Sequence, residues 1–188
     1  MGPQDALLFA DATRLRLFPP LRAAWARMGE QAVVPVTGRN DRRVLFGAIN
    51  VRTGHRLTVQ WPCETGPGAR ALLEEVRRRY RRAPTIWLLL DRGPAHTAAP
   101  TPRRAQELGI ELVWLPLQWP ELNGMDQRWR ERKRLVAAHR QAAYIDRLAQ
   151  EAEDWLLGLS TREARTKAGI LSPRFWLRSV LQNFCLDT

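Results

Sequence analysis

Apolar and polar positions along residues 1–61 follow the spacing of β-strands. Residues 6–10 (ALLFA) form an apolar run that ends at Asp11, and residues 43–51 (RVLFGAINV) form a second run. After a turn at Thr53 and Gly54, residues 55–61 alternate between apolar and polar positions, which is typical of a strand with one buried face. Three strands joined by turns predict an antiparallel arrangement.

Residues 66–115 alternate between helical and strand patterns. Apolar residues from Ala69 to Tyr80 recur at helical spacing and leave a run of arginines pointing outward. Residues 85–90 and 110–115 are uninterrupted apolar runs, as expected of strands covered on both faces, with a short helix between them. A strand, a helix and a strand in that order predict two parallel strands.

The last third of the chain has only helical patterns. Apolar residues recur at helical spacing from Leu122 onward and again between Ile145 and Leu159. Residues 1–188 are therefore predicted to form one α/β domain. Its mixed five-stranded sheet has three antiparallel strands followed by two parallel ones, with helices on both faces and a helical C-terminal tail.

The charge balance indicates a polyanionic partner. The chain has 30 Lys and Arg against 19 Asp and Glu, a formal net charge of +11, and nucleic acid is the first candidate for such a partner. Only Lys133 and Lys167 are lysines, and a GC-rich genome would also produce this arginine bias. Charge alone therefore leaves the partner open.

The cysteines and the N-terminus indicate the compartment. Cys63 and Cys185 lie far apart, with no spacing typical of a zinc module or a disulfide framework. No apolar run reaches the length of a membrane helix, and the chain does not begin like a secretion signal. We therefore expect a soluble cytoplasmic protein without a membrane partner.

Two aspartates end apolar runs of the predicted sheet. Asp11 follows one run and Asp91 follows residues 85–90, so each carboxylate should reach the edge of a rigid sheet. If the two strands are adjacent, the carboxylates converge and their repulsion favours a bound divalent cation. The alternative is that each aspartate only caps the turn that follows its strand.

Asp126 is the third acidic candidate. It follows a loop bounded by Pro116 and Pro120 and falls in the first turns of a predicted helix, beside Trp129, which would anchor that helix to the core. Thirty-four residues separate Asp91 from Asp126, enough for a helix, a strand and the loop.

Several blocks of sequence, in order and suitably spaced, resemble one family. They are LLFAD, WARMG, LFGAINVRTG, LLLDRGPAH and LPLQWPELNGMDQRW. Together they resemble the catalytic domain of DDE-superfamily transposases, and specifically the bacterial insertion-sequence enzymes related to the mariner group. The resemblance covers nearly the whole chain.

The resemblance implies a fold, an activity and a set of partners. The fold would be ribonuclease H-like, with Asp11, Asp91 and Asp126 holding two Mg²⁺ or Mn²⁺ ions for cleavage of transposon ends and strand transfer into target DNA. The active complex would contain two protomers, a homodimer, associated with the bacterial nucleoid. The alternatives are another ribonuclease H-like nuclease and an inactive remnant that binds nucleic acid.

Four positions depart from the family pattern. Ala12 stands where relatives often have Glu, Arg92 where Asn is usual, Gly124 where Pro is usual, and Asp126 where Glu is usual. Aspartate in the third place occurs in mariner-type relatives. Its shorter side chain moves the carboxylate back by one methylene.

Further residues are expected to support the site or to contact DNA. His96 would either approach the scissile phosphate or cap the following helix, and Asn123 would be either a helix N-cap or a partner of a metal ligand. Trp119 is the candidate for stacking on a base. The predicted DNA contacts are Arg92, Trp119, Arg128, Arg130, Lys133 and Arg134.

Recognition of transposon ends is expected to come from elsewhere. Relatives place a helix-turn-helix region before the catalytic domain, whereas Asp11 follows only ten residues here. We therefore expect a separate or fused N-terminal helix-turn-helix chain to supply specificity. Residues 1–188 alone should bind DNA with little sequence preference.

Overall fold

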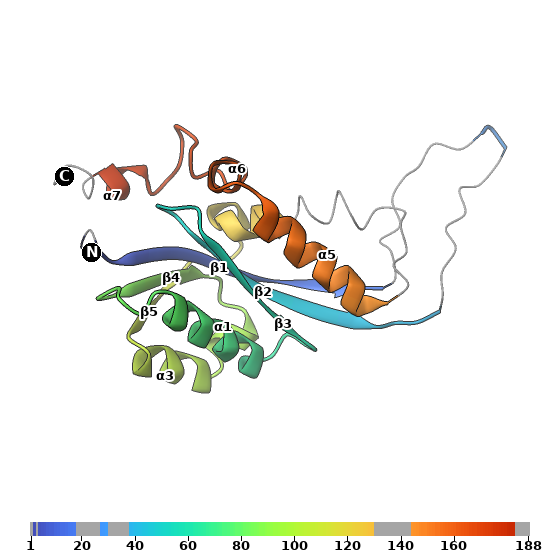
Figure 1. Ribbon diagram of the computed structural model, residues 1–188, viewed down its shortest axis with the longest axis horizontal. Coiled ribbons are helices and arrows are strands. Elements are labelled where there is room, and N and C mark those ends of the chain that lie inside the picture. The colour runs from blue at the N-terminus through green and yellow to red at the C-terminus, as the bar shows by residue number, and fades with distance from the viewer. Residues whose placement is uncertain (1, 3, 18–26, 30–37, 130–143, 183–188) are drawn as a thin grey trace.

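The computed structural model describes residues 2, 4–17, 27–29, 38–129 and 144–182. In them, a five-stranded sheet with the strand order β3-β2-β1-β4-β5 lies between two layers of helices (Figure 1). β1 (Ala6–Arg16) and β2 (Arg42–Asn50) are antiparallel, as are β2 and β3 (Arg56–Trp61). β4 (Ile86–Leu90) is parallel to β1 and to β5 (Ile110–Trp114), so the predicted strands and their directions are confirmed.

β1 is apolar at its start because both of its faces are covered. Ala6, Leu8 and Ala10 belong to the core on one face, and Leu7 and Phe9 belong to the core on the other. Successive side chains of a strand point to opposite faces, so an uninterrupted apolar run is needed wherever both faces are buried.

The first face of the sheet is covered by α1 (Gly66–Arg79) and α3 (Pro100–Glu107) (Figure 1). α1 buries Leu72, Leu73 and Val76 at helical spacing. Between β4 and α3 lies a second short helix, α2 (Pro94–Thr97), where the sequence indicated only one. The break falls at Ala98, where the backbone leaves the helical region with a ψ of 127°.

The second face is covered by α5 (Ile145–Gly158), which buries Ile145, Leu148, Ala152 and Leu156. Its carboxyl end is fixed by Arg56 of β3, whose guanidinium donates to the carbonyl oxygen of Leu157 at 2.9 Å and also to that of Leu159. This arginine satisfies carbonyl groups that a helix leaves without partners at its end.

Short helices complete the described chain. η1 (Pro120–Leu122) is a single turn of 3-10 helix, and residues 124–129 are helical. α6 (Thr161–Lys167) begins with a capping box in which Ser160 and Glu163 bond each other's backbone N–H groups, and α7 (Arg178–Gln182) follows. Of the helices in the described ranges, none is long and apolar enough to cross a membrane.

Candidate functional site

A cavity of about 410 Å³ opens beside the carboxyl end of β4. It brings together residues that lie far apart in the sequence, and all three predicted carboxylates line it. The lining residues are Asp11, Asp91, Arg92, Gly93, Leu115, Pro116, Leu117, Gln118, Trp119, Pro120, Asn123 and Asp126.

Asp11 ends the apolar run at the start of β1, as the sequence indicated, but it does not end the strand. β1 continues to Arg16 and pairs there with β2, where Asp11 lies opposite Gly47. The last pair between β1 and β4 joins Phe9 to Leu89, so β4 stops short and leaves this part of β1 open on one side. Asp11 reaches the cavity because its neighbouring strand ends.

Asp91 directly follows β4, as predicted. Its side chain is 58% exposed, and its Oδ1 accepts a hydrogen bond from the backbone N–H of Gly93 at 3.1 Å. A Cβ atom on Gly93 would lie 3.2 Å from that same oxygen, closer than side chains normally approach. Glycine therefore allows the tight turn that holds one carboxylate oxygen in place.

His96 lies in α2, is almost fully buried and faces Asp91. Its Nε2 is 3.7 Å from Asp91 Oδ1, which is beyond hydrogen-bond distance, and its ring meets Phe46 edge-on. Burial lowers the pKa of His96 although the charges of Asp91 and Glu64 oppose this, which favours a neutral ring. No side chain caps α3, so the predicted capping role is not found.

Of the two roles that the sequence left open for Asn123, the structure shows the helix cap. Its Oδ1 accepts a hydrogen bond from Met125 N at 2.9 Å, which caps the helical residues 124–129. Its Nδ2 donates to the carbonyl oxygen of Ala10 at 2.9 Å. This buried amide therefore ties the helix that carries Asp126 to the strand residue that precedes Asp11.

The helix that carries Asp126 packs closely on the sheet. Met125 and Trp129 are buried, and a Cβ atom on Gly47 would lie only 2.6 Å from Met125 Cε and 2.7 Å from Trp129 Cζ2. Gly124 is confined in the same way, because its Cβ would lie 3.0 Å from the carbonyl oxygen of Ala168. Two glycines thus permit the close approach that brings Asp126 to the cavity.

The donor set suits a hard divalent cation, because carboxylate oxygens are the ligands that Mg²⁺ and Mn²⁺ prefer. Asp11, Asp91 and Asp126 line the walls of one cavity. They do not form a compact cluster: within the ranges described above, no group of three acidic, histidine or cysteine residues is close enough to hold an ion. Joint binding would require the side chains to converge.

The loop after β5 forms an exposed apolar rim on the cavity. Leu117 is 69% exposed and Trp119 is 56% exposed. Between them, Gln118 has a φ of 63°, in the left-handed region that residues with a Cβ atom adopt at a cost. The sequence indicated Trp119, but it gave no signal for Leu117 or for the conformation of Gln118.

The predicted DNA contact of Arg128 is wrong, because this side chain is fully buried. Its guanidinium lies over the ring of Trp155 from α5, 5.1 Å from the ring centroid. Two positions after Asp126, this side chain points toward α5. Arg92 is exposed and lines the cavity, whereas Arg130, Lys133 and Arg134 lie outside the described residues.

Comparisons with known proteins show the family of the chain. A family model described as "DDE superfamily endonuclease" matches residues 6–149. A curated protein from Shigella sonnei, the insertion element IS630 uncharacterized 39 kDa protein, is 23% identical over 154 residues, which cover 81% of this chain and 45% of that protein. The chain thus spans about half the length of the relative that it matches.

Solved structures of the mariner transposase Mos1 share the fold. A paired end complex with Mg has a TM-score of 0.70 and 14% identity, over 95% of this chain and 55% of that one. The Mos1 catalytic domain has a TM-score of 0.63 and 12% identity, over 95% and 82% of the two chains. The predicted ribonuclease H-like fold is therefore confirmed.

Proposed function

Because the chain belongs to the DDE superfamily endonuclease family, we propose that it is the catalytic core of a transposase. Its reaction would be metal-dependent cleavage of DNA at transposon ends, followed by transfer of the cut strand into target DNA. The observation that carries this proposal is that Asp11, Asp91 and Asp126, from three separate elements, line one cavity.

Asp11, Asp91 and Asp126 would hold two Mg²⁺ or Mn²⁺ ions. Such a pair of ions, when bound, activates the attacking oxygen and stabilises the leaving oxygen of a phosphodiester. The Mos1 catalytic core has been solved with Mg and with Mn, which supports the choice of ions.

The residues around the cavity would position the carboxylates for metal binding. Gly93 N–H holds one oxygen of Asp91, and Asn123 fixes the helix of Asp126 against β1. A neutral His96 leaves the negative charge of the cavity intact, whereas a protonated ring would compete with a cation for Asp91. These contacts fix the backbone positions from which Asp91 and Asp126 would converge on a cation.

The cavity rim would contact the DNA. Arg92 stands beside Asp91 and can donate to a phosphate, and the exposed ring of Trp119 can stack on a base. Specific recognition of the element's ends would come from a separate or fused helix-turn-helix chain, and two copies of the protein would join two ends. The paired-end complexes of Mos1 support the joining of two transposon ends.

The test is cleavage of supercoiled plasmid by the purified chain in Mg²⁺ or Mn²⁺. We expect nicking that chelator abolishes and that Asp91→Asn removes, while Asp154→Asn, an exposed carboxylate on α5, retains it. An RNA–DNA hybrid serves as the second substrate, since a preference for it would indicate a ribonuclease H. DNA binding without any nicking would support the inactive remnant and contradict the proposal.

A further inference from the structure

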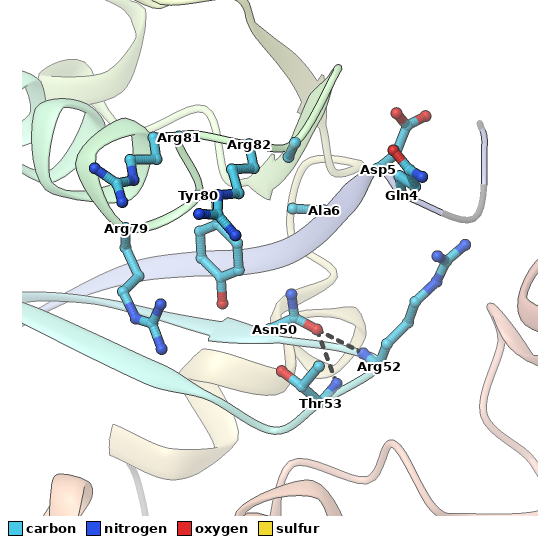
Figure 2. A pocket seen from close by; sticks show the side chains of 11 residues that line it. Gln4, Asp5, Ala6, Asn50, Arg52, Thr53, Arg79, Tyr80, Arg81 and Arg82 are labelled. Atoms are coloured by element: carbon cyan, nitrogen blue, oxygen red, sulfur yellow. Dashed lines mark hydrogen bonds between the residues drawn. The ribbon is translucent and has the colours of Figure 1, made fainter.

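A second and larger cavity, about 730 Å³, lies at the opposite end of β4 from the carboxylates. Three short segments form it: the start of β1, the turn between β2 and β3, and the loop between α1 and β4. Its charged lining residues are four arginines and one aspartate: Arg52, Arg79, Arg81, Arg82 and Asp5. Figure 2 shows Arg52 on one side of the hollow, across from Arg79 and Arg82.

The turn between β2 and β3 forms one wall of this cavity, the arginine cavity, and Asn50 holds the turn in one conformation. This buried side chain accepts hydrogen bonds from the backbone N–H groups of Arg52 and Thr53, each at 2.9 Å (Figure 2). The turn therefore presents Arg52 from a fixed backbone.

The opposite wall, the loop after α1, is fixed by Arg77. Its guanidinium donates to the carbonyl oxygens of Tyr80 at 2.8 Å and Ala83 at 3.1 Å, the two ends of the segment that carries Arg81 and Arg82. Both walls are thus preorganised before any ligand binds, which lowers the entropy lost on binding.

His55 orients the side chains of Arg79 and Tyr80. Arg79 Nε donates to His55 Nε2 at 3.1 Å, and His55 Nδ1 lies 3.2 Å from the hydroxyl of Tyr80. Because an arginine can only donate, Nε2 must be the acceptor and the proton of a neutral ring must lie on Nδ1, facing Tyr80. Arg79 and Tyr80 are therefore held together at the cavity edge.

The positive charge of the cavity is not neutralised by its own aspartate. Asp5 accepts hydrogen bonds from Gly2 N at 2.7 Å, Thr85 N at 3.2 Å and Trp87 Nε1 at 3.4 Å. Within the described ranges, no carboxylate forms an ion pair with Arg79, Arg81 or Arg82, all of which lie at the surface. A ligand with several negative charges would meet the guanidinium groups of Arg79, Arg81 and Arg82, whose charges no described carboxylate neutralises.

We propose that this cavity is a second DNA site, which binds backbone phosphates of a DNA segment other than the one held at the carboxylates. The choice of DNA among phosphate-bearing ligands rests on the proposed function. Exposed arginines on two separate turns suit a backbone that runs along the surface. A rise of about 3.3 Å per strand residue puts Ala6 about 17 Å from Asp11. The two cavities share no lining residue and lie at opposite ends of the neighbouring β4.

The first test compares two double variants that each remove two positive charges. Arg81→Gln with Arg82→Gln alters the arginine cavity, and Arg103→Gln with Arg162→Gln alters exposed arginines on α3 and α6. Binding of a labelled random duplex without metal is measured between about 50 mM and about 200 mM salt, where each phosphate contact adds about 0.9 to the slope of log K against log salt. We expect the slope of the cavity variant to fall by about 1 to 2 and that of the control to stay unchanged. Equal slopes in both variants would overturn the proposal.

The second test uses the unaltered chain and so does not depend on the folding of a variant. Phenylglyoxal modifies exposed arginines, and mass spectrometry locates the adducts. Duplex DNA should protect Arg79, Arg81 and Arg82 but leave Arg103 reactive. Protection by a nucleoside triphosphate and not by duplex would identify a nucleotide site and overturn the proposal, as would equal modification with and without DNA.

Nicking assays on the same variants separate this proposal from the proposed function. If the chain nicks plasmid but the slope of log K against log salt is unchanged in the Arg81 and Arg82 double variant, the second DNA site is wrong and the transposase proposal stands. If no metal supports nicking and the slope still falls, the cavity binds DNA and the proposed chemistry is wrong.

Discussion

The two ends of β4 carry opposite charges, and the charged residues at each end lie on different kinds of structure. At one end, Asp11 lies on a strand, Asp91 directly follows another, and Asp126 lies in the helical residues 124–129, so regular elements position the carboxylates. At the other end, the arginines lie in or beside turns fixed by Asn50 and Arg77. The proposed metal site needs a defined geometry, which strands and helices provide. The proposed phosphate contacts tolerate more variation, so turns are sufficient for them.

The largest expected effect is at the acidic end. Asp126→Asn keeps the shape of the side chain but removes a ligand charge, so nicking should fall below detection while the fold remains. Losing a group that merely orients a ligand already costs about 10- to 100-fold. The assay is plasmid nicking, with the circular dichroism spectrum as the check on folding. Native-rate nicking by Asp126→Asn would place the third ligand elsewhere.

The close packing beneath Asp11 should give the next largest effect. Gly47→Ala places a Cβ atom 2.6 Å from Met125 Cε, and such overpacking costs about 1–3 kcal/mol of unfolding free energy. Gly158→Ala is the matched control, because nothing lies within 4 Å of its added Cβ. Chemical denaturation measures both variants. Equal stabilities would show that the helix of Asp126 does not approach β2 this closely.

Substitutions of Asn123 should have a smaller effect, and different substitutions separate its two hydrogen bonds. Asn123→Ala loses the helix cap and the hydrogen bond to Ala10, so it should lower stability by about 1–2 kcal/mol. Asn123→Ser keeps an oxygen that can cap the helix, but its shorter side chain loses the donor to β1. If that donor sets the spacing of the carboxylates, Asn123→Ser should be more stable than Asn123→Ala and still bind Mn²⁺ more weakly than the unaltered chain. Native Mn²⁺ affinity in both variants would limit Asn123 to a structural role.

The smallest effect is a pH dependence at the basic end. Burial of His55, with the charges of Arg79 and Arg56, lowers its pKa below the ordinary value of 6.5, and Tyr80 also faces the ring. Below pH 6.5 the unfolded chain therefore binds more protons than the folded chain. Stability should fall as pH drops through 6.5 toward the lowered pKa. Melting temperatures at about pH 7.5 and about pH 5.5 should differ less in His55→Asn.

Uninterrupted apolar runs made the sheet predictable from the sequence. The strand before Asp91 is covered on both faces, so each of its positions must be apolar. This pattern is visible in the sequence of the strand alone. The position of Asp11 was less predictable, because the strand edge that exposes it depends on where β4 ends. Sequence analysis also missed the burial of Arg128, since the ring of Trp155 that covers it comes from a helix in another part of the chain.

The arginine cavity could not be predicted for a similar reason. Its residues come from three short segments, and each arginine alone is an ordinary exposed residue. The resemblance to a family drew attention to the carboxylates and gave no reason to group Arg52 with Arg79. Only the pairing of β1 with β2 and β4 brings these segments to one end of the sheet.

Calorimetric titration with Mn²⁺ tests the central claim most directly, because it measures joint metal binding without requiring DNA or turnover. The unaltered chain should bind Mn²⁺, and Asp11→Asn, Asp91→Asn and Asp126→Asn should each weaken that binding, while Asp154→Asn should not. Unchanged Mn²⁺ affinity in Asp91→Asn would contradict the account, because the three carboxylates would then share a cavity without sharing a metal.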